Sequence, residues 1–291
     1  MNHLENEKIR IAVRERGAEL TSIFHKDLQK EYLWQADPTY WGKHAPVLFP
    51  VVGALRDEEF IHEGKVFNLS RHGFARDLDF LLVEMGSDYL EYELEATEET
   101  KAWYPFDFTL RIRYTLEGEQ VHTDYFVKNK GVKEMFYSLG AHPAFNWPLD
   151  EEESFGDYRL RFSKKENLDS LLIDNETGLR TLEKRTVVAG SDFLLLDHSL
   201  FQEDALIFED VESEWIRFES EKSNRFIQVS LEGFSHLGIW TKPNHAPFLC
   251  IEPWQGLCDR QDTTKELTQK EGIRSVEAGK ENQVRLTIAI G

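Results

Sequence analysis

Apolar and polar residues alternate along many short stretches of this chain, and this alternation is what most limits its possible folds. The clearest stretch is residues 108–116, where Phe, Leu, Ile, Tyr and Leu occupy every second position. Residues 120–127 can return antiparallel to it across Glu117-Gly118-Glu119, a hairpin-like connection. A period of two sends successive side chains to opposite faces, so these stretches predict strands with one buried face.

Similar runs recur to the end of the chain, while long amphipathic patterns are scarce. Only residues 263–270 suggest a short helix, with Asp262 as its N-cap. Segment 163–182 is mostly polar and mixed, so it is expected to be an exposed excursion and not a domain boundary. No low-complexity linker or internal repeat divides the chain. Many strands and few helices predict one all-β domain spanning residues 1–291, a sandwich or a barrel. Residues 60–67 are a second hairpin candidate, and further predicted strands cover residues 9–13, 205–209, 215–218, 226–231, 237–241, 248–252 and 284–290.

The charge balance limits the kinds of partner. The net charge is −19, a field that repels phosphate backbones and anionic membranes. We therefore expect neither nucleic-acid nor membrane binding. A small phosphorylated ligand stays possible, since a local pair of arginines can outweigh the global field.

Cysteine content and the N-terminal sequence favour a cytoplasmic protein. Cys250 and Cys258 form neither a CxxC pair nor a disulfide framework, so both are expected to be free thiols. Residues 1–8 have no apolar core of the kind a signal peptide needs. No stretch approaches the roughly 20 apolar residues of a membrane span. The sequence gives no clear signal for oligomeric state, and a monomer or a homodimer is expected.

Glu252 is the first candidate for chemistry. It closes the apolar run 248–251 and precedes Pro253, which favours an extended conformation and a strand ending there. Alternation places Cys250 and Glu252 on one face of that strand, so the carboxylate can point into a cleft beside Trp254. The alternative is an ordinary surface glutamate at a strand end.

Two histidines stand in comparable turn-rich, aromatic surroundings. His142 precedes Pro143, and its small neighbours leave room around an imidazole that titrates near neutral pH. His72 precedes Gly73, which permits unusual backbone angles or the close approach of a ligand. The alternative for an imidazole is a hydrogen-bonded core position.

Arginine and tryptophan side chains near these segments are suited to binding a sugar. Arg76 offers a fork of donors to hydroxyls or to a phosphate, although a solvated turn would also account for it. Trp254 and Trp147 can pack an indole face on the C–H face of a pyranose, or can simply fill the core.

Sequence signatures of other chemistries are absent. The chain has no GxGxxG, GxxxxGK[ST], HExxH or GxSxG pattern. Two histidines and a glutamate can form a facial metal triad, but no local ligand spacing supports one. We expect neither a metal nor an organic cofactor.

Four short motifs, in order along nearly the whole chain, resemble the aldose 1-epimerase (galactose mutarotase-like) family. The similarity is greatest to the bacterial branch with a PxLFPxxG, HGFxR, HPxF and EPW pattern, and residues 17–22 resemble the family's opening strands. Here the motifs are Pro46–Gly53, His72–Arg76, His142–Phe145 and Glu252–Trp254.

The resemblance implies a large antiparallel β-sandwich that interconverts the α and β anomers of an aldose without metal or cofactor. It makes Glu252 the base, His142 the acid and His72 a second imidazole near the ring oxygen. Asp204 matches a substrate-binding aspartate of the family. Relatives place an arginine against the sugar near the position of Arg56, for which Lys43 and His44 are alternatives.

Two other functions remain compatible with the sequence. Arg71 and Arg76 together favour a hexose-6-phosphate 1-epimerase. A non-catalytic carbohydrate-binding protein on the same fold is the other, although the joint presence of Glu252, His72 and His142 argues against it. The expected ligand is thus a small sugar or a sugar phosphate.

Overall fold

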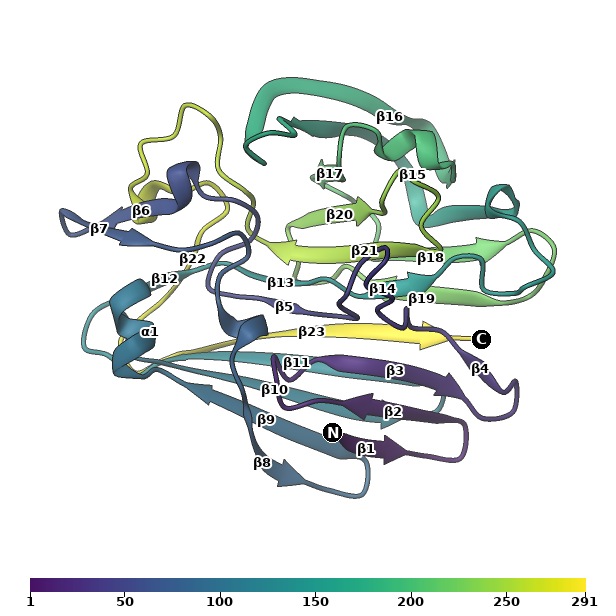
Figure 1. The fold of residues 1–291 in the computed structure, drawn as a ribbon, viewed down its shortest axis with the longest axis horizontal. Helices are drawn as coiled ribbons and strands as arrows, with labels where there is room; N and C mark the ends of the chain where they lie inside the picture. Colours follow the sequence, from purple (N-terminus) through teal and green to yellow (C-terminus); the bar gives the residue numbers. More distant parts are fainter.

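The computed structural model describes residues 1–291, and most of its elements are antiparallel strands (Figure 1). The largest sheet has 15 strands, in the order β5-β13-β21-β20-β17-β15-β18-β19-β23-β11-β10-β9-β8, with β14 beside β21 and β16 beside β15. Its strands are β5 (Val47–Leu48), β8 (Leu81–Met85), β9 (Tyr89–Glu95), β10 (Phe108–Glu117), β11 (Gln120–Asn129), β13 (Leu139–Ala141), β14 (Ala144–Asn146), β15 (Tyr158–Ile173), β16 (Arg180–Leu195), β17 (Leu206–Glu209), β18 (Trp215–Ser220), β19 (Phe226–Ser230), β20 (His236–Trp240), β21 (Phe248–Gln255) and β23 (Glu281–Ile290).

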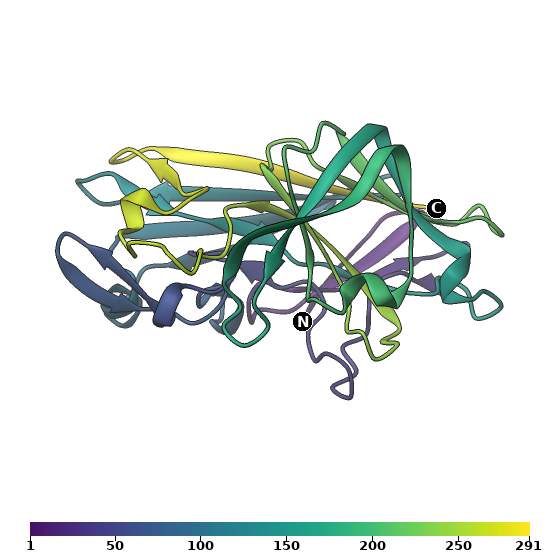
Figure 2. The same cartoon turned by 90° about the horizontal axis from the view of Figure 1, so that it is seen from above.

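A second sheet packs on the first and makes the fold a sandwich. Figure 1 shows its strands crossing in front of β9, β10 and β11, and Figure 2 shows the two layers from above. The Tyr114 hydroxyl donates to the Ala18 carbonyl across the layers at 2.8 Å. The predicted all-β sandwich is confirmed. The second sheet contains β1 (Asn2–Glu5), β2 (Ile9–Val13), β3 (Leu20–His25) and β4 (Lys30–Glu31). Two-stranded ladders join β6 (Glu59–His62) to β7 (Lys65–Asn68) and β12 (Met135–Tyr137) to β22 (Arg274–Val276).

The predicted hairpin of β10 and β11 forms in the expected register. Glu117 faces Gln120, and the pairing continues without a shift to Phe108 and Asn129. Leu110, Ile112 and Tyr114 of β10 are buried, as the alternation requires. They join one cluster of buried apolar side chains that extends from Leu4 to Ile290.

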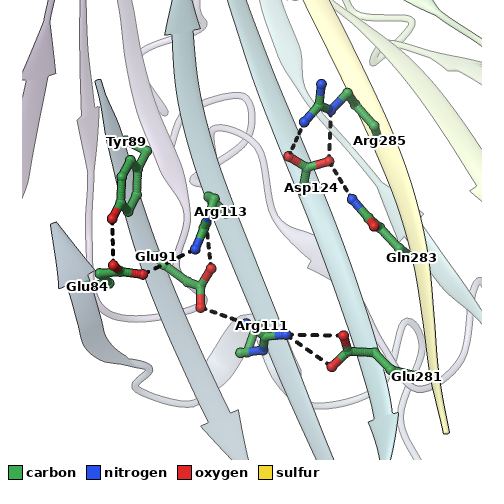
Figure 3. A network of polar contacts seen from close by, with 9 residues as sticks. All are labelled: Glu84, Tyr89, Glu91, Arg111, Arg113, Asp124, Glu281, Gln283 and Arg285. Atoms are coloured by element: carbon green, nitrogen blue, oxygen red, sulfur yellow. Dashed lines mark hydrogen bonds and ion pairs between the residues drawn. The ribbon is translucent and has the colours of Figure 1, made fainter. Parts of the chain in front are cut away.

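The outward side chains of the same sheet region form ladders of ion pairs (Figure 3). Arg111 and Arg113 both bind the buried carboxylate of Glu91. Asp124 lies next to them, 2% exposed, and accepts bonds from Arg285 at 2.8 and 2.7 Å and from Gln283 at 3.1 Å. Opposite charges on neighbouring strands stabilise their pairing.

Helical segments differ most from the sequence prediction. The α-helix is α1 (Glu98–Trp103), which was not predicted and begins at a capping box formed by Thr97 and Thr100. The predicted helix 263–270 is wrong: only the short 3₁₀ turn η5 (Leu267–Gln269) forms there, and Asp262 pairs with Arg260. No helix has the length and apolar character to cross a membrane. The other 3₁₀ turns are η1 (Arg56–Glu58), η2 (Ala75–Asp77), η3 (Phe155–Asp157) and η4 (His198–Phe201).

The polar segment 163–182 belongs to a long hairpin and is not wholly exposed. It includes the C-terminal part of β15 and the start of β16, and this hairpin arches over β17 and β20 (Figure 1). Leu168 and Leu171 are buried, and Ile173 reaches the cavity described below.

Candidate active site

A cavity of about 320 Å³ lies where β20 and β21 meet the loops that carry His72, His142 and Asp204. Its fifteen lining residues include most of the candidates from the sequence. Those candidates are His72, Arg76, His142, Asp204, Glu252 and Trp254. Segments far apart along the chain therefore converge on one space.

Glu252 lies inside β21 and not at its end, because the strand continues through Pro253 to Gln255. On the side facing β13 and β14, the Ile251 N–H donates to the Pro143 carbonyl. By alternation, the backbone nitrogen of residue 253 points to the same side as that of Ile251. The pairing with β13 and β14 is interrupted at that position. A proline lacks the N–H that an unbroken ladder would need, so its position fits the gap. His142 stands in that gap, opposite the glutamate.

The His142 imidazole and the Glu252 carboxylate form a buried pair. Nε2 of His142 lies 3.2 Å from Oε2 of Glu252, and the two residues are 8% and 1% exposed. Trp41 stacks on the imidazole, with ring centroids 4.9 Å apart, and Trp240 meets it edge-on. These aromatic contacts hold the imidazole ring in place.

Burial favours the uncharged form of both members of this pair. It lowers the pKa of His142 to about 3, with a further contribution from the positive charge of Arg76. Burial also raises the pKa of Glu252 well above its usual value, and the negative charge of Asp204 adds to the effect. The neutral pair, a carboxylic acid beside an imidazole, is therefore the favoured resting form. Moving that proton to His142 gives the alternative ionic form.

His72 supplies a neutral hydrogen-bond donor. The Gly53 N–H donates to His72 Nδ1 at 3.1 Å, so the proton of the neutral ring resides on Nε2. Burial lowers the pKa of His72 well below its usual value, and a proton on the neighbouring His142 would lower it further. The His72 ring meets His142 edge-on, with centroids 5.8 Å apart.

The backbone at His72 and Gly73 is left-handed, with φ of 70° and 68°. A Cβ on Gly73 would lie 2.3 Å from the Phe49 carbonyl oxygen, a backbone atom that cannot easily move. The glycine therefore allows two chain segments to touch directly beneath the site.

Gly73→Ala is expected to reduce the free energy of unfolding by clearly more than about 1 kcal/mol, the scale of alanine strain at positive φ. The matched control is Gly118→Ala, which has a φ of 57° and nothing within 4 Å of its added Cβ. Urea denaturation of both variants separates the cost of the steric clash at Gly73 from the cost of positive-φ strain, which the two variants share. Equal losses would contradict the expected clash.

Three cations and a carboxylate complete the lining. Arg71, Arg76 and Lys242 reach the cavity beside Asp204. Arg76 donates to the Arg71 carbonyl at 2.7 Å, and the Arg71 guanidinium lies 3.7 Å from Asp204. These groups can bind sugar hydroxyls or an anionic substituent.

Trp254 also lines the cavity, and glycines on both neighbouring strands make room for it. A Cβ on Gly140 or Gly238 would lie 2.7 or 2.5 Å from the indole. The small residues near His142 were expected to leave space around the imidazole. The Trp254 indole fills the space beside one of them, Gly140. The indole Nε1–H is buried, and its interaction with Glu252 works against the burial that raises the pKa of that carboxyl.

The structure does not place Arg56, Lys43 or His44 among the cavity-lining residues. Arg56 donates its side chain to the Thr263 carbonyl at 3.0 Å, and Lys43 pairs with Asp77. His44 lies beside Glu19. Trp240 and Lys242 line the cavity but were not predicted from the sequence. The pattern that could have indicated them is an aromatic and a basic residue at the end of a predicted strand, just before Pro243.

A set of possible metal-ligand atoms also meets at this site. One donor atom each from His142, Cys250 and Glu252 lies within 4.8 Å of the others. Burial, aided by the charge of Glu252, raises the pKa of the Cys250 thiol well above its usual value, so the sulfur favours its protonated form. A metal ion would have to displace that proton.

The fold and the site define a class: an antiparallel β-sandwich that buries a histidine–carboxylate pair in a cavity lined by aromatic and basic side chains. Comparison with known proteins identifies the family. A sequence model described as "Aldose 1-epimerase" matches residues 1–271, and the chain belongs to this family.

Similar proteins cover almost the entire chain. Protein LacX (plasmid) of Lactococcus lactis subsp. lactis is 38% identical over 94% of this chain and 93% of its own. A galactose mutarotase related enzyme from Lactobacillus acidophilus superimposes with a TM-score of 0.94 at 31% identity, covering 100% of this chain and 97% of its own. A galactose mutarotase-like protein from Lactobacillus casei gives 0.93 at 32% identity over 100% of both chains.

Proposed function

We propose that the protein is an aldose 1-epimerase that opens and closes the ring of a free aldose by general acid–base catalysis. The observation that carries the proposal is the buried pair of His142 and Glu252, 3.2 Å apart at the wall of the cavity. A buried carboxyl group whose Oε2 has no hydrogen-bond partner is costly to keep unless it has a task.

The reaction requires two proton transfers at neighbouring oxygens. In its ionic form, Glu252 removes the proton of the C1 hydroxyl while the His142 imidazolium protonates the ring oxygen. Ring opening leaves Glu252 protonated and His142 neutral, which is the resting form that burial favours. Rotation about C1–C2 then presents the other carbonyl face, and the same pair closes the ring in reverse.

The remaining groups orient the sugar. His72 donates from Nε2, which suits an oxygen near the ring. Asp204 and Arg76 stand on the cavity wall as further hydroxyl partners. Indole faces at Trp41 and Trp240 can pack on pyranose C–H groups.

A specific observation keeps a second substrate class open. Arg71, Arg76 and Lys242 bring three positive charges to one cavity of a chain whose net charge is −19. Such a cluster suits the 6-phosphate of a hexose, so a hexose-6-phosphate 1-epimerase is the second candidate.

Mutarotation rates of freshly dissolved glucose and galactose, and of their 6-phosphates, test the proposal. We expect acceleration with the free sugars, unchanged by a chelator because no step needs a metal. Acceleration confined to the phosphates, and lost in Arg71→Gln, would favour the second candidate. Saturable binding with no acceleration would indicate a carbohydrate-binding protein.

The location and oligomeric state remain predictions. Both cysteines are buried and free, which supports a reducing, cytoplasmic location. A monomer or homodimer is still expected.

A further inference from the structure

His72 is bound through both its backbone and its ring to one residue, Gly53, on the wall behind it. The His72 N–H donates to the Gly53 carbonyl at 2.9 Å, and the Gly53 N–H donates back to the His72 Nδ1 at 3.1 Å. Backbone and ring are thus both tied to Gly53. Any displacement of Gly53 would alter the bond that decides which ring nitrogen carries the proton.

Gly53 and the residues after it lie directly against Cys258 and Asp259. A Cβ on Gly53 would lie 2.3 Å from the Cβ of Cys258, so the two segments are in close contact. The Asp259 N–H donates to the Ala54 carbonyl at 2.9 Å, and its Oδ2 accepts from the Arg56 N–H at 3.0 Å. Asp259 therefore holds segment 54–56 at both ends.

Asp259 is in turn held by a buried cation. Its Oδ1 lies 2.6 Å from Nζ of Lys270, and the two residues are 5% and 6% exposed. Arg180 supports the same strand-like segment through bonds to the carbonyls of Cys258 and Asp259. Neither Asp259 nor Lys270 lines the catalytic cavity.

A buried ion pair of this kind is weak evidence for stability. The cost of removing two charges from water largely offsets their attraction, and apolar replacements of similar volume are often as stable. Its directional bonds, by contrast, define where segment 54–56 lies. We therefore expect this pair to affect the position of segment 54–56 more than the stability of the fold.

We propose that the Lys270–Asp259 pair is a positioning device that sets the tautomer of His72 through Gly53. With the pair intact, the Gly53 N–H points at Nδ1, and Nε2 presents its proton to the cavity. Asp259 and Lys270 act only through this contact and touch no substrate. The expected effect on activity rests on the proposed function, whereas the effect on the tautomer does not.

Asp259→Asn breaks the arrangement with little change of shape. The amide has one acceptor oxygen where the carboxylate has two, so its N–H₂ faces either the Lys270 ammonium or the Arg56 N–H, and two donors oppose each other. The buried ammonium also loses the charge of its partner. Segment 54–56 then relaxes and the Gly53 N–H no longer fixes Nδ1. We expect the proton of His72 to distribute over both nitrogens and the donor in the cavity to be partly lost.

Two-bond ¹H–¹⁵N spectra of the full-length protein, labelled at histidine, report the tautomer directly. The His72 signal is assigned by its absence in His72→Asn. The wild type is expected to show only the neutral Nε2–H form, and Asp259→Asn a mixture. Mutarotase kcat/KM is expected to fall about 10–100-fold, the scale of a small misplacement.

The matched control is Asp124→Asn, which removes a comparably buried carboxylate from its arginine on the outer face of the sheet (Figure 3). It is expected to lower stability while leaving the His72 spectrum and kcat/KM unchanged. Asp259→Asn/Lys270→Gln, in which the glutamine carbonyl can accept from the asparagine amide, is expected to recover the wild-type spectrum partly.

An unchanged His72 spectrum in a folded Asp259→Asn variant would overturn the proposal, whatever its activity. The same holds if Asp124→Asn perturbs His72 equally. Should Asp259→Asn not fold, Lys270→Gln and the double variant decide on the same spectrum. A shifted tautomer in a protein without mutarotase activity would support the positioning pair and reject the proposed function.

Discussion

Replacing Glu252 with glutamine is expected to reduce accelerated mutarotation by at least about 10²-fold, the lower end of the contribution of one positioned proton transfer. Glutamine keeps the shape of the side chain but cannot take the proton of the C1 hydroxyl. The partner proton on His142 then has no source, because the pair holds only one. Polarimetry of freshly dissolved glucose or galactose measures the loss.

The same variant is expected to gain stability relative to the wild type as the pH rises. The folded pKa of Glu252 is raised above its unfolded value near 4.5. Its contribution to stability is thus fully present below that value and lost as the pH rises through the folded pKa. Glutamine does not ionise, so the stability of the variant relative to wild type should increase from pH 4 to pH 8.

Denaturation at these two pH values provides the measurement, and the exposed Glu232→Gln is the control. That substitution should change neither activity nor the pH dependence. Full activity in Glu252→Gln would remove Glu252 from the mechanism. A variant that is less stable at pH 8 than at pH 4, relative to wild type, would show that the buried carboxylate is stabilising.

The parts of the fold that could be predicted are those with local causes. The β10–β11 hairpin follows from side-chain alternation around Gly118, and each partner lies close in sequence. The pairing of β11 with β23 joins Gln120 to Ala289, and no local pattern specifies such a partner. The strand order in the large sheet therefore could not be predicted from local sequence patterns.

Tertiary contacts explain why the helix predicted at residues 263–270 does not form. Its sequence suits a helix, but Lys270 is drawn inward to Asp259 and Arg260 binds Asp262, the intended cap. A buried ion pair and a side-chain contact outside the segment thus override a weak local preference.

The candidate site divides in the same way. Short motifs identified His72, His142 and Glu252, which the structure places around one cavity. Trp240 escaped notice because its role depends on the pairing of β20 with β21, where it faces Cys250. Arg56 illustrates the limit of spacing: Asp57 has a φ of 57°, and the arginine beside this turn extends to Thr263.

His142→Asn is expected to lower kcat/KM by about 10²–10⁴-fold and to change its pH profile. In the wild type the one-proton form of the pair exists between the pKa of His142, about 3, and the raised pKa of Glu252. Activity should therefore fall on the alkaline side, when the pair loses its proton, at a pH well above 4.5. The variant retains the base but has no acid, so residual activity should rise, not fall, as Glu252 ionises.

Combining His142→Asn with Glu252→Gln distinguishes a shared proton from two independent groups. When two residues act as a unit, replacing either one already abolishes their joint contribution to the rate. The double variant should therefore be about as slow as the more impaired single variant. Independent groups would instead multiply their losses. Because the imidazole and the carboxylate are 3.2 Å apart and burial disfavours charging either one alone, non-additivity is the expected result. Multiplicative losses in folded variants would mean that acid and base each exchange protons with solvent and that the shared-proton mechanism is wrong.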